Sequence, residues 1–196
     1  MKRAFIIQVF FLLFISCTHQ KDKNKELPSD SIFNLQSTWQ NQNGDTLQLQ
    51  QLRGKTLVVV MIYTSCKTAC PMLVANMKKI EQKIKPRNLD KTSLVLVSID
   101  PETDTPERLK LFSETNHMKA GHWIFLRSDE KSTQEFANVL AMKYKKISPI
   151  DFSHSNIISV FSPDGQLKTQ EEGTNIETDK IAAKVNETIA ANSQLL

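Results

Sequence analysis

The sequence lacks several features that mark specialised proteins. It has only three cysteines in 196 residues, no internal repeat and no low-complexity block. So few cysteines do not make a disulfide-stapled scaffold, and a chain of this length buries a real core without staples. The formal charge of +4 is modest, and without a basic face it does not indicate nucleic-acid binding. These absences leave one ordinary globular domain with a tail.

One long hydrophobic run is present, at the N-terminus. Two basic residues precede the apolar residues 4–15, a stretch in the signal-peptide range and too short for a comfortable membrane span. Ser16 and Cys17 follow at once and resemble a bacterial lipobox, in which the Cys is lipidated. We therefore predict a lipoprotein-type signal peptide over residues 1–16, with lipidation at Cys17. An ordinary secretory signal or an uncleaved anchor, with Cys17 incidental, is the alternative.

All of these signals place the remaining chain outside the cytoplasm, and the lipoprotein signal predicts that it is lipid-anchored to a bacterial membrane on the periplasmic side. Residues 17–31 are polar and lysine-rich, which is typical of a flexible tether. We expect the folded domain to occupy residues 32–196. Two cysteines remain there, Cys66 and Cys70. In an oxidising compartment this pair must be bound to something, bridged, or kept reduced by a partner.

The rest of the chain alternates strand and helix patterns. Two continuous β-branched runs are typical of strands buried on both faces, and apolar residues at helical spacing follow the first. The order predicts an α/β fold with a central mixed sheet flanked by helices. The expected elements are strands 46–50 and 56–63, helix 70–84, strand 93–99, helix 106–115, strand 123–126, helix 131–142, strands 155–161 and 166–169, and helix 178–191.

Cys66 and Cys70 come directly after the first buried strand, at the start of a helix. We expect Pro71 at the first helical position, which makes Cys70 the N-cap. The positive helix end, together with Lys67, would lower the thiol pKa values. Two thiolates so placed either converge on one soft cation or pair as a disulfide. A buried structural pair, or a local disulfide, is the alternative without function.

A third ligand would favour the metal. Two thiolates and one imidazole suit Cu(I), which prefers soft ligands and accepts three, whereas structural zinc would want a fourth. The candidate imidazoles are His117, His122 and His154, each of which is otherwise an ordinary surface or capping residue. His154 lies just before a predicted strand, so we expect it on a loop at a strand end.

Three segments together resemble the Sco/SenC family, over roughly residues 32–190. They are Thr-Ser-Cys-Lys-Thr-Ala-Cys-Pro at 64–71, Val-Ser-Ile-Asp-Pro-Glu-Thr-Asp-Thr-Pro at 97–106, and His154-Ser155 followed by Ser-Pro-Asp-Gly at 162–165. The resemblance implies a thioredoxin-like fold with an inserted β-hairpin near the C-terminal strands. It also implies that Cys66, Cys70 and His154 bind copper, as Cu(I) or Cu(II).

The same resemblance implies a function. It describes a membrane-tethered copper chaperone for the dinuclear copper centre of cytochrome c oxidase. The expected partners are the copper-receiving oxidase subunit, the membrane through the lipid anchor, and a protein that reduces the thiols; no nucleic acid is expected. The enzymatic alternative is an extracytoplasmic thiol–disulfide oxidoreductase with Cys66 and Cys70 as its catalytic redox pair. A copper or redox sensor, or a plain lipoprotein binding module, without a delivery step is the third hypothesis.

Two aspartates belong to the matching motif. Asp100 stands at a strand end on the side of the cysteines, where it could orient a copper ligand through a hydrogen bond. For Asp104 we expect a capping role, with Thr105, at the helix that begins at Pro106.

The site departs from the family pattern at two places. Lys67-Thr68 stands where members often carry Pro-Asp, and Ser153 stands where they often carry Asp before the His. The first change makes the site more positive and favours disulfide exchange. The second removes a group that would orient His154.

Overall fold

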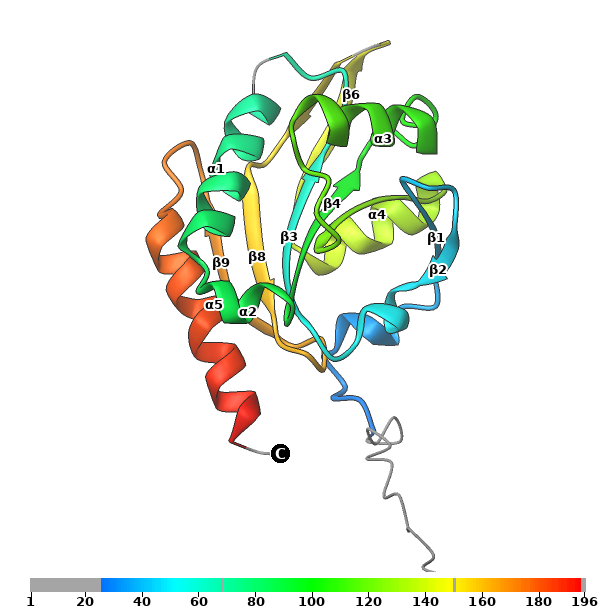
Figure 1. Cartoon of the computed structure of the whole chain (residues 1–196). Helices are drawn as coiled ribbons and strands as arrows, with labels where there is room; N and C mark the ends of the chain where they lie inside the picture. Colours follow the sequence, from blue (N-terminus) through cyan, green and yellow to red (C-terminus); the bar gives the residue numbers. More distant parts are fainter. Residues whose placement is uncertain (1–25, 68, 150, 195–196) are drawn as a thin grey trace, which may run out of the picture.

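The computed structural model describes residues 26–67, 69–149 and 151–194 (Figure 1). The predicted signal peptide over residues 1–16 and the lipidation site Cys17 lie outside the described residues. Within the described ranges, no helix has the length and apolar character needed to cross a membrane.

Seven strands form the central sheet, in the order β2-β1-β5-β4-β3-β8-β9. Strands β3, β4 and β5 pair in parallel, and the other neighbours pair antiparallel. The predicted mixed sheet is therefore confirmed. The strands are β1 (Thr38–Asn41), β2 (Thr46–Gln48), β3 (Thr56–Ile62), β4 (Thr92–Ser98), β5 (Trp123–Arg127), β8 (Ile157–Phe161) and β9 (Leu167–Glu172).

Helices cover both faces of this sheet (Figure 1). Right-handed crossovers from β3 to β4 and from β4 to β5 run in one direction, so their helices α1 and α3 share a face. Helix α5 packs beside α1 on that face, and α4 lies on the other. The helices are α1 (Ala69–Lys83), α2 (Pro86–Leu89), α3 (Pro106–Thr115), α4 (Glu130–Val139) and α5 (Thr178–Ser193).

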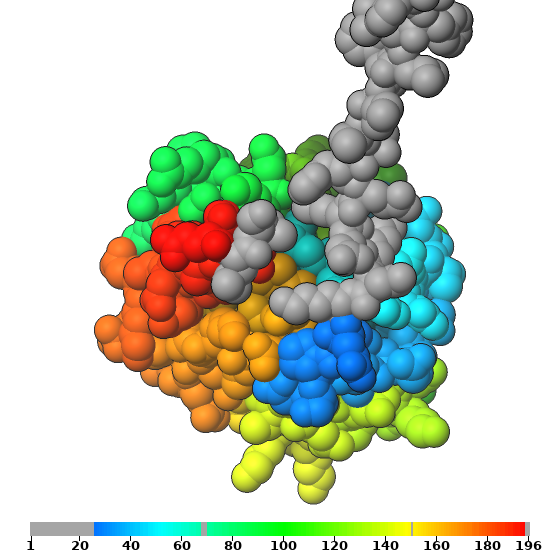
Figure 2. Space-filling model, turned by 90° about the horizontal axis from the view of Figure 1, so that it is seen from below, coloured from blue at the N-terminus to red at the C-terminus, as the bar shows by residue number. Residues whose placement is uncertain are grey.

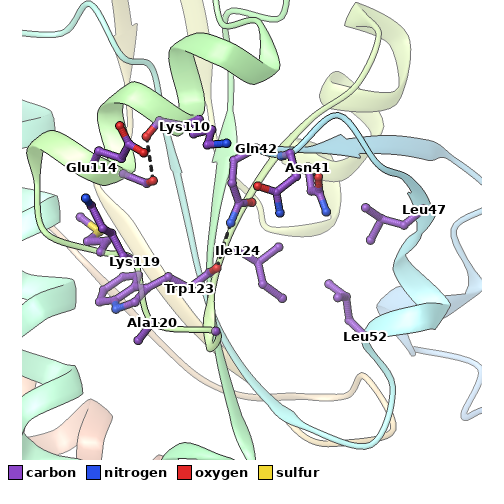
Figure 3. A pocket seen from close by; sticks show the side chains of 14 residues that line it. Asn41, Gln42, Leu47, Leu52, Lys110, Glu114, Lys119, Ala120, Trp123 and Ile124 are labelled. Atoms are coloured by element: carbon purple, nitrogen blue, oxygen red, sulfur yellow. Dashed lines mark hydrogen bonds between the residues drawn. The ribbon is translucent and has the colours of Figure 1, made fainter.

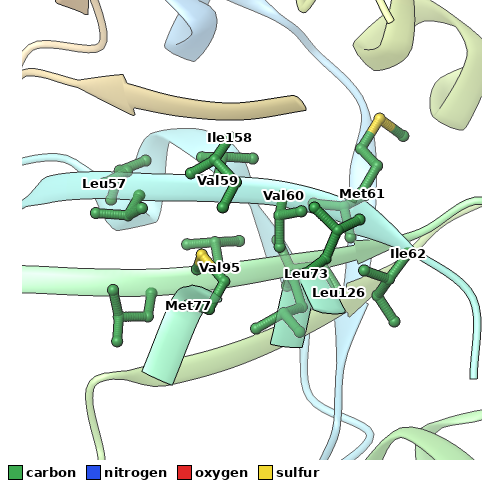
Figure 4. Close-up of a cluster of buried hydrophobic side chains, with 14 of the residues drawn as sticks. Leu57, Val59, Val60, Met61, Ile62, Leu73, Met77, Val95, Leu126 and Ile158 are labelled. Carbon is green, nitrogen blue, oxygen red and sulfur yellow. The ribbon is translucent and has the colours of Figure 1, made fainter. Parts of the chain in front are cut away.

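The core lies between the sheet and its helices. Every residue of β3 and β4 is buried, as their β-branched runs predict. Leu73 and Met77 of α1 are fully buried and project onto these strands (Figure 4). Burial of such a side chain contributes about 1.5–3 kcal/mol. The first half of α1, which carries Cys70, is thereby fixed to the sheet.

The chain enters the fold beside the turn between β8 and β9, where the short 3-10 helix η1 (Ile32–Asn34) begins. The Ile32 N–H donates to the Gly165 carbonyl over 3.0 Å. Gly165 has φ of +86°, and a Cβ there would lie 2.3 Å from the Ser31 hydroxyl oxygen. Figure 2 shows this blue segment against the orange turn. Both the backbone conformation and the close approach require glycine at position 165.

Some elements differ from the sequence prediction. The 3-10 helix η2 (Leu49–Leu52) replaces the end of the strand expected at 46–50. Helix α4 ends at Val139 because Ala141 adopts a left-handed conformation, with φ of +52°. Two short strands that patterns did not predict, β6 (Tyr144–Ser148) and β7 (Asp151–His154), pair as a separate two-stranded sheet. This hairpin is the insertion that the family resemblance implied.

Candidate metal centre

The two cysteines lie where the buried strand β3 ends and α1 begins. Cys66 is half-buried in the loop, and Cys70 is buried in the first turn of the helix. The Cys70 backbone N–H donates to Cys66 Sγ over 3.4 Å. Helix α1 begins at Ala69, so the predicted start at Pro71 and N-cap at Cys70 are wrong by two residues. Proline is tolerated in the first turn because N–H groups there need no helical acceptor.

His154 joins the cysteines from the other side. The ligand atoms of Cys66, Cys70 and His154 all lie within 4.8 Å of one another. Among the residues that the structure describes, this is the one group of three or more His, Cys, Asp or Glu side chains placed to hold a metal ion. His154 is the last residue of β7 rather than part of a loop, which corrects its predicted position.

The two other candidate histidines lie elsewhere. His117 is exposed after α3, with a left-handed φ of 57°. His122 lies 2.5 Å from the Glu81 carboxylate, which also accepts a hydrogen bond from the Trp123 indole over 2.8 Å. His122 therefore ties α1 to the start of β5 and takes no part in the metal centre.

Tyr63 connects the cysteine loop to the hairpin that carries His154. Its buried hydroxyl donates to the Asp151 carboxylate, and the Phe152 N–H approaches the hydroxyl oxygen at 3.4 Å. Its ring packs against Phe152, with centroids 5.1 Å apart, and edge-on against His154 at 5.8 Å. Burial, together with the bond to Asp151, raises the pKa of the Tyr63 hydroxyl, so it stays a donor at neutral pH. We name Tyr63, Asp151 and Phe152 the Tyr63 clasp.

Asp104 holds the start of the same loop. Its buried carboxylate accepts hydrogen bonds from the Thr64 N–H at 3.1 Å, from the Thr64 hydroxyl, and from Ser98 Oγ at 2.6 Å. Burial raises the pKa of this carboxyl, and the three donors oppose that shift. The expected capping role belongs to Thr105 alone, whose hydroxyl accepts from the Arg108 N–H. No local sequence pattern indicates the link between Asp104 and Thr64, which are 40 residues apart along the chain.

Asp100 is buried just beyond the end of β4. Its backbone N–H donates to Ser98 Oγ over 3.0 Å, and its Oδ2 is buried without a hydrogen-bond partner among the described residues. Asp100 does not belong to the group of converging ligand atoms. Its expected role in orienting a copper ligand stays a prediction.

The electrostatics of the pair differ from expectation. Burial raises the pKa of the Cys70 thiol, and the neighbouring Cys66 and Asp104 raise it further. The predicted lowering is therefore wrong for Cys70, because desolvation outweighs the helix N-terminus. Cys66 is the less buried residue of the pair, and its sulfur accepts the N–H from the first turn of α1. It is the better placed of the two to react first.

The donor set fits a soft metal. Two donors bound to one ion at about 2.3 Å can lie at most about 4.6 Å apart. The three ligand atoms lie within 4.8 Å of one another, so small side-chain rotations bring them within reach of one ion. Two sulfurs and one imidazole nitrogen suit Cu(I), which accepts three soft ligands. In the described part of the chain the group has no fourth His, Cys, Asp or Glu, which a structural zinc site would want.

A separate pocket of about 400 Å³ lies between the β1–β2 hairpin, α3 and the start of β5 (Figure 3). The Gln42 side chain runs along the edge of β5 there, donating to the Trp123 carbonyl over 3.2 Å and accepting from the Phe125 N–H over 3.0 Å. None of the three converging ligands lines this pocket, so it is not part of the metal centre.

Comparison with known proteins agrees with the geometry. Residues 26–190 match the family model described as SCO1/SenC. The chain belongs to the SCO1/SenC family. This SCO1/SenC protein is 31% identical, over 181 residues, to the SCO1 protein homolog of Bacillus subtilis (strain 168). The match covers 90% of this chain and 91% of the relative.

Solved structures show the same fold. The structure of BsSco, described as a member of the Sco family of cytochrome c oxidase assembly proteins with a disulfide switch, has 29% identity and a TM-score of 0.69, covering 78% of this chain and 91% of that one. Bradyrhizobium japonicum ScoI, solved with copper bound, has 21% identity and a TM-score of 0.66, covering 78% of this chain and 96% of that one. The expected thioredoxin-like fold of this SCO1/SenC protein is confirmed.

Proposed function

We propose that this SCO1/SenC protein is a membrane-tethered copper chaperone for assembly of the dinuclear copper centre of cytochrome c oxidase. The observation that carries the proposal is the convergence of Cys66, Cys70 and His154 within 4.8 Å. These residues would hold Cu(I) as cargo. The similarity to BsSco, a member of the Sco family of cytochrome c oxidase assembly proteins, supports the same client here.

The placement of the ligands suits release as well as binding. Cys70 is buried, whereas Cys66 and His154 are half-buried and lie on a loop and on a hairpin. A thiolate of the receiving subunit would approach the ion from the side of Cys66 and His154. With three protein ligands, the ion keeps room for an incoming fourth, so ligand exchange proceeds without prior dissociation.

Copper affinity tests the site. The full-length protein, purified in detergent and reduced, is titrated with Cu(I) against a chromogenic Cu(I) chelator. We expect His154→Asn to weaken Cu(I) binding at least tenfold, a loss of about 1.4 kcal/mol or more in binding free energy. The matched control is His117→Asn, which removes an exposed imidazole and suits the left-handed backbone there. Equal affinities for both variants, or one tightly bound equivalent in Cys66→Ser, would show that the proposed site is wrong.

Delivery has its own test. The copper-loaded protein is mixed with a reduced soluble fragment of the copper-receiving oxidase subunit, and the copper on each protein is measured after separation. We expect transfer to the fragment, and none when the two cysteines of the fragment are replaced by serine. Retention of all copper on the protein would contradict the chaperone function while leaving the binding site intact.

A second function, thiol–disulfide exchange, is favoured by the unequal burial of the two sulfurs. The Cys66 thiolate would attack a client disulfide, and Cys70 would then resolve the mixed disulfide. The client gains two thiols, the protein gains the Cys66–Cys70 disulfide, and a thiol reductant protein restores the pair. We expect Cys70→Ser to trap a mixed disulfide with a disulfide-bonded oxidase fragment. If the reduced wild type leaves that fragment oxidised, this function is excluded.

The membrane tether is part of the proposal. Lipid on Cys17 would hold the domain outside the cytoplasm, through the predicted tether that begins at this residue. Growth with a labelled fatty acid should label the wild type and leave Cys17→Ala unlabelled. Label retained in that variant would place the anchor elsewhere.

A further inference from the structure

The β6–β7 hairpin concentrates positive charge in a domain whose charges balance overall. Residues 26–194 contain equal numbers of basic and acidic side chains. Lys143, Lys145 and Lys146 lie together on or next to β6, and all three are exposed. The one acidic residue of the hairpin, Asp151, accepts the hydrogen bond of Tyr63. The hairpin therefore presents a net positive surface.

Two of these lysines are available to a partner. Lys146 pairs with Glu102 over 3.4 Å and lies over the Phe152 ring, 5.6 Å from its centroid. Lys143 and Lys145 form no ion pair with any residue in the described ranges. Lys145 stands opposite Ser153 in the β6–β7 register, on the face turned away from Tyr63.

The lysines share a groove with a metal ligand. An open groove of about 280 Å³ on the hairpin is lined by Lys143, Tyr144, Lys145, Ser153, His154 and Ser155. A carboxylate held by Lys143 and Lys145 would therefore lie at the end of the hairpin that carries His154, on the face opposite to the Tyr63 clasp. Exposed Lys67, next to Cys66, adds positive charge on the other side of the ligands.

We propose that this groove docks an acidic segment of the thiol-bearing protein that exchanges copper or disulfides with Cys66, Cys70 and His154. The proposal rests on the proposed function and names the chemistry of the partner. Opposite charge would raise the rate of encounter and orient the client toward the ligands. An anionic lipid surface is the weaker occupant, because a membrane on this groove would cover His154 and block the client.

The test measures docking without copper. The probe is a fluorescent peptide with two alkylated cysteines flanked by aspartates and glutamates, and serines replace the acids in its control peptide. Binding to the full-length, metal-free protein in detergent is followed by anisotropy at low and high salt. The variant Lys143→Glu/Lys145→Glu reverses the groove charge. Its matched control, Lys85→Glu/Lys91→Glu, makes the same charge change at exposed lysines at the opposite end of the sheet.

We expect the wild type to bind the acidic peptide about tenfold more tightly than the serine peptide at low salt, with the preference falling as salt rises. The groove variant should lose this preference, and the control variant should keep it. Equal binding of both peptides by the wild type, or equal loss in both variants, would overturn the proposal. Binding to vesicles of phosphatidylglycerol is measured with the same variants. The proposal would also be overturned if the groove variant kept its preference for the acidic peptide and lost binding only to these vesicles.

The peptide-docking test and the copper-binding test can fail independently of each other. Cu(I) affinity should be the same in the wild type and in both lysine variants, because none of these lysines is a ligand. If the acidic peptide docks in the groove while His154→Asn leaves Cu(I) affinity unchanged, the docking surface stands and the chaperone function fails. If copper binding behaves as proposed while the peptide does not discriminate, the docking surface alone is refuted.

Discussion

Replacing Tyr63 with phenylalanine removes one hydroxyl and keeps the ring. The ring contacts with Phe152 and His154 remain, whereas the hydrogen bond to the Asp151 carboxylate is lost. A hydrogen bond to a charged group contributes about 1.5–3 kcal/mol. Asp151 is exposed and regains water after the change, which favours the lower end of this range. We therefore expect a loss of about 1.5 kcal/mol in the coupling that holds the hairpin over the cysteines.

That loss should appear in metal affinity, since the hairpin brings His154 to the two sulfurs. A loss of about 1.5 kcal/mol weakens Cu(I) binding roughly tenfold. The matched control is Tyr144→Phe, which removes a hairpin hydroxyl for which the described residues show no hydrogen-bond partner and should leave Cu(I) affinity unchanged. Asp151→Asn should give an intermediate loss, because the amide oxygen still accepts the hydroxyl proton but carries no charge.

A double-mutant cycle tests whether Tyr63 acts on Cu(I) affinity through His154. In a His154→Asn background, Tyr63→Phe should cost no further Cu(I) affinity, because the ligand that the clasp positions is already gone. Additive losses would mean that Tyr63 acts through the cysteine loop or through overall stability. An affinity within twofold of wild type for Tyr63→Phe alone would mean that the clasp does not position His154.

The remaining predictions concern single groups. Iodoacetamide at neutral pH should label Cys66 before Cys70, because burial raises the pKa of the Cys70 thiol and leaves less thiolate. Peptide mapping at rising pH should show the labelling rate of Cys70 approaching that of Cys66. Equal labelling rates of the two cysteines at neutral pH would contradict this prediction. In a urea titration, Gly165→Ala should lower the free energy of unfolding by about 2 kcal/mol or more, because the new Cβ adds a steric clash to the strain of a positive φ. The control Gly44→Ala, with φ of +85° and open space around the Cβ, should lower it by about 1 kcal/mol. Asp104→Asn should lower the free energy of unfolding by about 1–3 kcal/mol, since three hydrogen bonds lose their charged acceptor; unchanged urea midpoints would argue that this carboxyl is already protonated.

Elements with strong local signals were predicted well from the sequence. The runs at 56–63 and 93–99 could only be strands buried on both faces, and both are. Thr105 before a proline predicted the start of α3, and its hydroxyl caps that helix. The loop between β3 and α1 was located because two cysteines directly follow a buried strand.

Features set by distant contacts were not predictable from local pattern. The β6–β7 hairpin is not predicted from local pattern, because Lys145 and Lys146 break the alternation of apolar residues by which strands are recognised. Tyr63 and Asp151 are 88 residues apart, and no local pattern signals that pairing. The sequence predicts a lowered pKa for the Cys70 thiol, whereas burial raises it, because a helix N-terminus is visible in a sequence and the burial of one side chain is not. Only the family resemblance singled out His154 among three histidines.

The separation of β6 and β7 from the main sheet has a kinetic consequence. Cys66 and Cys70 are carried by the end of β3 and the start of α1, which belong to the slowly opening core, whereas His154 is carried by two short strands that are mostly exposed. Amide protons of the hairpin should exchange with deuterium through local opening, far sooner than those of β3 and β4. The lifetime of the complete three-ligand site is then set by the opening frequency of a small appendage. Copper held as proposed would be released on that time scale, independently of the rate at which the domain unfolds.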